Sequence, residues 1–260
     1  MRATLILVLA LGCAPTAETP LTPDPERAPG QDPTCPATAG PEMARLPEGF
    51  CIDTTEVTQS QYEAWLETSP STDGQVAACA TNDDFTPTCR WEPGRYGDQP
   101  VVCVDWCDAR AFCEAAGKRL CGRIGGGGYD FDQYADAEVS EWQAACSSGG
   151  DHDYTYGDEL DTQVCRGADA ETHETWGFVD VGSLEGCHSP DDGYAAVFDL
   201  SGNAAEWDDG CESDDPDASC RIRGGSFEHN THGLRCAMGE RLGWPRMRKV
   251  VSVGFRCCAD

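Results

Sequence analysis

Two histidines near the C-terminal end of the chain have the spacing and the neighbours of metal ligands. His229 and His232 are three residues apart, and Glu228 precedes the first of them. Imidazole nitrogens together with a carboxylate can bind iron or zinc. The alternative, which is the more common role of such residues, is a polar pair on the surface that holds no metal. The sequence leaves both interpretations open.

Cysteine is the second residue type that could do chemistry, with 17 copies in 260 residues. The closely spaced pairs of zinc and iron–sulfur proteins are missing from the sequence. So high a cysteine content is then typical of a disulfide framework formed in an oxidising compartment.

Proximity along the chain predicts particular bridges. Cys79 with Cys89, and Cys211 with Cys220, are close enough to close short loops. Cys35 is expected to tie the N-terminal segment to the domain. For the remaining cysteines the connectivity cannot be deduced from the sequence.

A redox-active cysteine pair is the alternative to a purely structural framework. Cys257 is followed directly by Cys258, and Cys103 is four residues before Cys107. Structural bridges are the commoner use of such residues.

The balance of charge excludes one class of partner. The chain has 46 acidic and 18 basic residues, a formal net charge of −28. Because phosphate binding needs clustered Lys and Arg, we expect no nucleic acid partner and no direct attraction to anionic membranes. The carboxylates form a solvated surface, bind a hard cation such as calcium, or do both.

The N-terminus predicts export. Residues 1–12 combine one early positive charge with a short apolar run, too short to span a membrane, and a small residue precedes Cys13. This arrangement resembles a bacterial lipoprotein signal, in which the cysteine becomes acylated. We therefore expect a lipid anchor as the only membrane contact and a location in the cell envelope, with plain secretion as the alternative. Acylation of Cys13 leaves 17 − 1 = 16 cysteines, an even number that allows full pairing.

Residues 13–45 are rich in proline and poor in large apolar side chains, which predicts a disordered tether. Residues 46–260 form the expected domain, of the α+β class, rich in loops and stapled by disulfides. Its expected helices span residues 58–66, 108–116 and 140–146, and its expected strands span residues 50–53 and 100–104. Residues 124–132 and 208–220 are expected to be loops.

Six segments of residues 50–258 occur in a recognisable order. They are Phe50–Thr58 with Gln61–Tyr62, Pro100–Leu120, Glu141–Cys146, Gly202–Trp207, Arg223–Phe227 and Gly254–Cys257. Together they resemble the sulfatase-modifying-factor (formylglycine-generating enzyme) family, with an insertion at about residues 121–137. The resemblance implies a C-type-lectin-like fold. It also implies an enzyme that oxidises a sulfatase cysteine to formylglycine, using oxygen and copper held by two cysteines.

The chain departs from the family at those two cysteines. Counting from Ser226 places His229 at the first copper-ligand position, and counting back from Cys236 places Thr231 at the second. Cu(I) is a soft ion that prefers thiolates, so we expect neither copper nor formylglycine generation. Some remote relatives are non-haem iron enzymes, which keeps iron or zinc at His229 and His232 as an alternative.

The resemblance also implies structural features of the domain. The family pairs the positions of Cys113 and Cys257, and those of Cys146 and Cys236. Family members also hold one Ca²⁺, at positions that match the side chains of Asp199 and Glu206 and the carbonyls of Gly202 and Ala204 in this chain. They hold a second Ca²⁺ at positions that match the side chains of Asp169 and Glu174 and the carbonyls of Ala170 and Trp176.

Three functions therefore compete. The first is a non-catalytic, tethered module that binds a protein, peptide or glycan on the surface that is catalytic in relatives. The second is a metal-dependent oxidoreductase of the formylglycine-generating or non-haem iron type. The third is a purely structural envelope lipoprotein.

Overall fold

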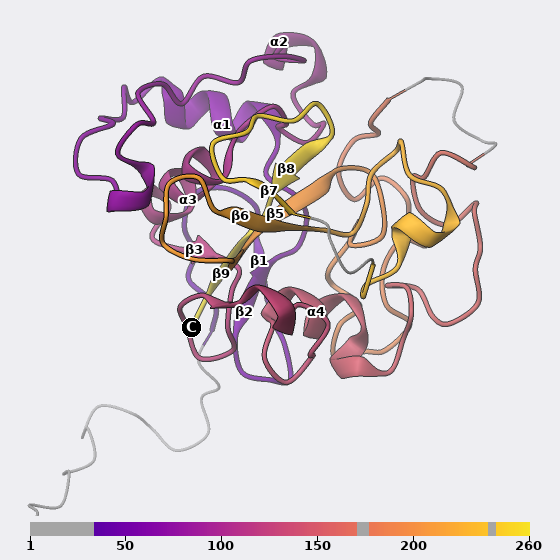
Figure 1. Ribbon diagram of the computed structural model, residues 1–260. Coiled ribbons are helices and arrows are strands. Elements are labelled where there is room, and N and C mark those ends of the chain that lie inside the picture. Colours follow the sequence, from indigo (N-terminus) through magenta and orange to yellow (C-terminus); the bar gives the residue numbers. More distant parts are fainter. Residues whose placement is uncertain (1–33, 171–176, 239–242) are drawn as a thin grey trace, which may run out of the picture. The chain divides into compact units, whose positions relative to one another are not determined.

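In this computed structural model, two small β-sheets organise the part of the chain that the structure describes, residues 34–170, 177–238 and 243–260 (Figure 1). The expected signal peptide, Cys13 and most of the expected tether lie outside these residues. Residues 34–260 form one unit. Its helices are short and its loops are long, which confirms the α+β, loop-rich class.

The first sheet joins the beginning of the domain to its end. Its strands are antiparallel neighbours in the order β1 (Met43–Arg45), β2 (Cys51–Asp53), β9 (Cys257–Ala259) and β3 (Arg119–Leu120). Ile52 is opposite Cys258, and Leu120 is opposite Cys257. The opening and closing segments of the family pattern therefore lie side by side.

The second sheet is built around β5. Its strands are β4 (Tyr129–Asp130), β5 (Ala205–Cys211), β6 (Ser219–Arg223), β7 (Gly243–Pro245) and β8 (Val253–Phe255). β5 pairs in parallel with β4 and β8 and antiparallel with β6. Because β5 has partners on both edges, most of its residues are buried.

Each of the three longest helices begins directly after a capping residue, and the helix expected over residues 108–116 starts two residues earlier than predicted. α1 (Gln59–Leu66) starts after Thr58 and α3 (Trp106–Ala115) after Asp105, each with a complete capping box. α4 (Glu141–Cys146) starts after Ser140, whose side chain accepts a hydrogen bond from Gln143. The remaining helical pieces are α2 (Pro93–Tyr96) and the 3₁₀ turns η1 (Ala77–Cys79), η2 (Phe131–Gln133), η3 (Ser148–Gly150) and η4 (Thr231–Leu234).

Aromatic rings pack between α1, α3 and β8 to form the larger part of the core. Tyr62 stacks on Phe112 with ring centroids 5.6 Å apart, and Phe255 meets both rings edge-on. All three side chains are buried. This cluster attaches the helices to the strand in which the closing motif begins.

Several expectations about local structure were wrong. Residues 208–220 are not wholly loop, since they contain the end of β5 and the start of β6. Residues 100–104 form no ladder, because Cys103 has a left-handed backbone (φ 60°) that breaks an extended strand. Residues 124–132 are not wholly loop, since they contain β4 and the start of η2. Residues 34–45, expected in the tether, belong to the folded unit, where β1 pairs with β2 and Cys35 is bonded to Cys51.

All sixteen cysteines of the described residues are paired. The bridges are Cys35–Cys51, Cys79–Cys107, Cys89–Cys103, Cys113–Cys257, Cys121–Cys258, Cys146–Cys236, Cys165–Cys187 and Cys211–Cys220. They include both pairs that the family resemblance implied. So many bridges indicate an oxidising environment outside the cytoplasm. No helix among the described residues is long and apolar enough to cross a bilayer.

The predicted Cys79–Cys89 bridge was wrong. Cys79 lies on η1, which packs against α3 and so meets Cys107, whereas Cys89 meets Cys103. Because Cys103 and Cys107 are bonded to different cysteines, they do not form a redox pair with each other. Cys257 and Cys258 are likewise bonded to other cysteines rather than to each other.

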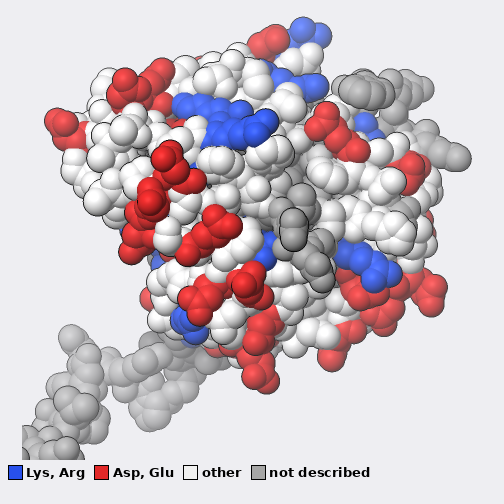
Figure 2. All heavy atoms as spheres, viewed as in Figure 1, with Lys and Arg blue, Asp and Glu red and all other residues white. Residues whose placement is uncertain are grey.

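Acidic side chains are spread widely over the face shown in Figure 2, while Lys and Arg gather in a few places. This distribution agrees with the net charge of −28.

Candidate functional site

A tight glycine turn follows β6 and leads the chain to His229. Gly224 and Gly225 have positive φ angles of 77° and 68°. A Cβ on Gly225 would lie 2.1 Å from the carbonyl oxygen of Gly233, which is far inside contact distance. Only glycine fits such an approach. The turn therefore folds the segment that follows it back against η4.

Ser226, the residue after this turn, holds the imidazole of His229. The Nδ1 atom of His229 lies 3.0 Å from the backbone nitrogen of Ser226 and 2.9 Å from its hydroxyl oxygen. A backbone N–H can only donate, so Nδ1 accepts, and the neutral ring carries its proton on Nε2. Burial lowers the pKa of His229, which favours this neutral form.

This geometry does not suit iron or zinc. A neutral imidazole binds a metal through a free lone pair, but Nδ1 of His229 is occupied and Nε2 carries the proton. His232, in η4, is exposed, and so is Glu228. Among the described residues no three His, Cys, Asp or Glu side chains are grouped to hold a metal ion.

Copper fits no better. The position that the resemblance gives to the second copper ligand is Thr231, the first residue of η4. No cysteine lies between Ser226 and Arg235, and every cysteine of the described residues is in a disulfide. A thiolate pair for Cu(I) is therefore missing from this part of the chain.

A buried cluster of carboxylates lies at the other end of the family pattern, around Arg256. The guanidinium of Arg256 binds Glu206 with two short contacts, 2.7 Å and 2.8 Å, and Trp142 donates to the same carboxylate. Asp199 and Glu56 are also buried close to this pair. Three carboxylates thus face one guanidinium.

Two oxygens of this cluster lack a hydrogen-bond partner. They are Oδ1 of Asp199 and Oε2 of Glu56, and both are buried. Burial raises the pKa of Asp199 to about 6 and also raises that of Glu56. A buried carboxylate without a partner is costly, so the cluster favours a bound cation or a proton. A proton shared between Asp199 and Glu56 satisfies these oxygens, and a hard cation such as calcium, held by the two carboxylates and backbone carbonyls, is the alternative.

The structure brings Asp199 and Glu206 together, with Gly202 and Ala204 on the loop between them. Glu206 is already paired with Arg256, so the free oxygens belong to Asp199 and Glu56. The sequence analysis missed Glu56 as a site residue. Its only signal was its place in the opening motif of the family pattern.

The loop that carries these residues also reaches the Ser226 segment. Asn203, with a left-handed backbone (φ 54°), donates from its side chain to Glu56 at 3.1 Å. Its carbonyl accepts a hydrogen bond from the backbone of Phe227 at 2.9 Å. Asn203 therefore connects the carboxylate cluster to the residue that follows Ser226.

The second expected calcium site lies only partly within the described residues. Asp169 and Ala170 end one described segment, and Glu174 and Trp176 lie outside the described residues.

Comparisons with known proteins agree with this fold. Residues 19–260 match the sulfatase-modifying factor enzyme 1-like domain. The solved structure of CarF is 20% identical, with 81% of this chain and 85% of that chain covered and a TM-score of 0.53. PvdO from Pseudomonas aeruginosa is 18% identical, with 86% and 90% covered and a TM-score of 0.54. At these identities the likeness concerns the fold alone. No curated protein sequence matches the chain.

Proposed function

The chain belongs to the family of sulfatase-modifying factor enzyme 1-like domains, and from that premise we propose that it is a non-catalytic binding module. It holds a protein, peptide or glycan on the surface around His229, whose ring the buried Ser226 orients.

The observation that carries this proposal is the Ser226–His229 pair. An imidazole with a fixed tautomer stands where the resemblance places the first copper ligand. Its Nε2–H is a preorganised donor, suited to a carbonyl or hydroxyl of a ligand. Neither member of the pair offers the soft sulfur that Cu(I) needs.

The scaffold supports the same reading. Eight disulfides hold loops that have little regular structure, and such loops can present a binding surface on a rigid frame. The Cys113–Cys257 and Cys146–Cys236 bridges join residues 144 and 90 positions apart. A rigid frame lowers the ordering cost of binding.

Calcium is the proposed structural ion. Asp199 and Glu56 would hold it, with carbonyls of the loop that contains Gly202 and Ala204, while Glu206 stays with Arg256. Because Asn203 connects this loop to Phe227, the ion would also fix the segment that carries His229.

The proposed location is the bacterial cell envelope, with Cys13 acylated and the domain exported. The disulfide content supports export, and the anchor rests on the N-terminal sequence. Release of the protein from membranes after Cys13→Ser would support the anchor. Equal partitioning of the variant and the parent chain would refute it.

Arrays of immobilised peptides and glycans test the binding function. The full chain is expected to bind at least one member, and His229→Ala should abolish that binding while the chain stays folded, with a lower melting temperature because the buried N–H of Ser226 loses its acceptor. His188→Ala is the matched control, because His188 is a half-buried histidine with its own backbone contact elsewhere. The proposal fails if nothing binds, or if both histidine variants bind as the parent chain does.

A further inference from the structure

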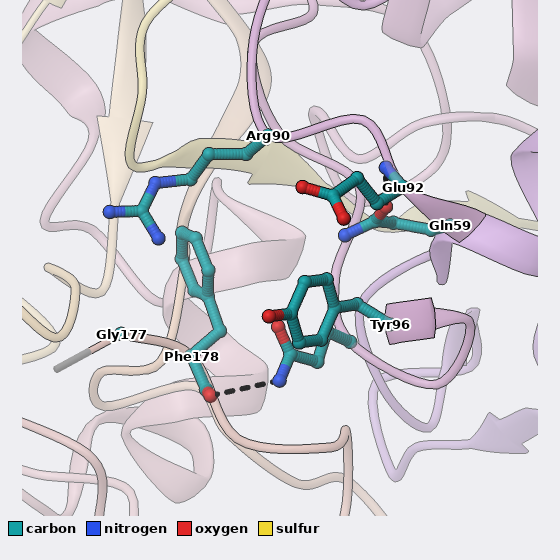
Figure 3. A pocket seen from close by; sticks show the side chains of 7 residues that line it. Gln59, Arg90, Glu92, Tyr96, Gly177 and Phe178 are labelled. Carbon is teal, nitrogen blue, oxygen red and sulfur yellow. Dashed lines mark hydrogen bonds between the residues drawn. The ribbon is translucent and has the colours of Figure 1, made fainter. Parts of the chain in front are cut away.

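A pocket with a volume of about 280 Å³ lies beside α2 and is not part of the site described so far. It is lined mainly by Gln59, Arg90, Glu92, Tyr96, Gln99 and Phe178. Figure 3 shows Glu92, Gln59 and the ring of Tyr96 grouped on one side of the Phe178 ring, while the side chain of Arg90 extends past the other side of that ring. The pocket thus combines aromatic faces with donors and acceptors.

Arg90 is held in place without a carboxylate partner among the described residues. Its guanidinium lies 5.5 Å from the ring centroid of Phe178 and 5.4 Å from that of Phe227. Its neighbour Cys89 is bonded to Cys103, which fixes the backbone at this point. The planar donor group is therefore stacked and preorganised rather than neutralised.

The polar groups on the other side of the pocket are also oriented. Gln59 accepts a hydrogen bond from the backbone of Glu92 at 3.0 Å, which leaves its amide nitrogen as a donor. Gln99 donates to the carbonyl of Phe178 at 3.2 Å (Figure 3). These contacts tie the two sides of the pocket together.

The charges in the pocket select against an ion. Glu92 is exposed and its carboxylate already lies 3.7 Å from the guanidinium of Arg95, so a ligand cation would have to displace that arginine, and a ligand anion at Arg90 would lie beside a carboxylate. A neutral ring bearing hydroxyl groups satisfies both, because a hydroxyl donates to the carboxylate and accepts from the guanidinium or amide. Its C–H face can pack on the ring of Tyr96, whereas the ring of Phe178 is buried and already carries Arg90.

We infer that this pocket is a subsite for one neutral pyranose ring of a glycan. The volume is just below the range of pockets for drug-sized ligands, which suits a single sugar unit. The inference rests on the proposed binding function, whose ligand it assigns to the glycan class. Phe178 and Phe227 meet edge-on at 4.7 Å, and Phe227 follows Ser226 directly, so a buried aromatic contact connects the pocket to the segment that carries His229.

Methyl glycosides titrated into the full chain test the subsite. The probes are the methyl glycosides of glucose, galactose, mannose and N-acetylglucosamine, followed by saturation-transfer NMR and calorimetry. At least one should bind with a Kd on the order of 1 mM. Tyr96→Ala and Arg90→Ala should each weaken it by about tenfold or more. Arg248→Ala is the control, since Arg248 is an exposed arginine stacked on Trp244 outside the pocket.

Glu92→Gln provides a second variant that keeps the shape of an exposed side chain and should also weaken binding. The inference is overturned if no neutral glycoside binds at roughly 50 mM. It is also overturned if the glucuronide, glucosamine or a free amino acid binds more tightly, or if the pocket variants bind as the parent chain does.

The outcomes separate this inference from the proposed function. Array binding that depends on His229, without any glycoside binding, refutes the sugar subsite and keeps the binding module. If a glycoside binds in a way that depends on Tyr96, the sugar subsite is supported. If His229→Ala then leaves array binding unchanged, the binding site proposed at His229 is refuted.

Discussion

The imidazole Nδ1 of His229 faces both the backbone nitrogen and the hydroxyl of Ser226, at 3.0 Å and 2.9 Å. One short loop thereby fixes which ring nitrogen carries the proton. The consequence is a neutral hydrogen-bond donor at a position where the family resemblance implied a metal thiolate.

The tautomer of His229 can be observed by NMR. Nitrogen–proton correlation spectra of the imidazoles should show the proton on Nε2 at neutral pH and a pKa below the ordinary value of 6.5, because burial disfavours the charged ring. The signal is assigned by its loss in His229→Ala. A proton on Nδ1, or a pKa above 6.5, would contradict the geometry.

Calcium should stabilise the protein through the carboxylate cluster. At a calcium concentration about 100 times Kd, the expected gain in unfolding free energy is about 2.7 kcal/mol. Asp199→Asn and Glu56→Gln should each remove most of the calcium-dependent rise in melting temperature. Asp214→Asn changes the charge equally at an exposed position and should leave the rise intact. Identical melting curves with calcium and with chelator would rule out the ion.

Asp209 should make stability depend on pH. Burial raises its pKa to about 6 from 3.8, so the folded state binds more protons than the unfolded state between these values. The free energy of unfolding should therefore fall as pH rises from about 4 to about 6, by at most about 3 kcal/mol.

Asp209→Asn tests this dependence, because the amide cannot titrate. Its chemical denaturation curves should lose this part of the pH dependence and show higher stability than the parent chain at neutral pH. Asp217→Asn, at an exposed position, is the control. A variant with the same pH profile as the parent chain would show that Asp209 titrates normally.

A disulfide that closes a long loop should stabilise the protein more than one that closes a short loop. Replacing Cys113 and Cys257 by serine opens a loop with a sequence separation of 144 and should cost about 5 kcal/mol in the chain-entropy model. Replacing Cys211 and Cys220, with a separation of 9, should cost about 2.6 kcal/mol. Denaturant titration measures both, and a reversed order would contradict the pairing or the model.

Peptide mapping checks the connectivity itself. Digestion without reductant should yield Cys79 linked to Cys107 and Cys89 linked to Cys103. Thiol titration of the denatured, unreduced Cys13→Ala variant should find no free thiol. Recovery of a Cys79–Cys89 peptide would restore the pairing that proximity in the sequence predicted.

Local signals in the sequence predicted α1 and α4 to within a residue, placed the start of α3 two residues late and missed the short helix α2. Thr58, Asp105 and Ser140 are capping residues whose effect extends over one turn, so each could be located from its neighbours alone. The short Cys211–Cys220 bridge was found for the same reason. The segment at residues 100–104 was misread because the left-handed backbone of Cys103 depends on its distant contacts.

The candidate site was only partly predictable. Counting from Ser226 was enough to single out His229. Its tautomer depends on the turn at Gly224 and Gly225, whose close approach to Gly233 only the folded chain shows. Glu56 lies almost 150 residues from Asn203, its hydrogen-bond partner, and nothing local marks it as buried with Asp199 and Arg256. The pocket around Arg90 likewise needs Phe178 and Phe227, which only the tertiary fold brings to it.

The most direct test of the account is incubation of the purified full chain with Cu(I), oxygen and a sulfatase-motif peptide, followed by mass spectrometry of the peptide. An active formylglycine-generating enzyme serves as the positive control. Because imidazole and hydroxyl groups replace the thiolates, the peptide cysteine should remain unoxidised beyond the level seen with copper alone. Catalytic conversion of that cysteine to the aldehyde would contradict the proposal that this domain binds rather than oxidises.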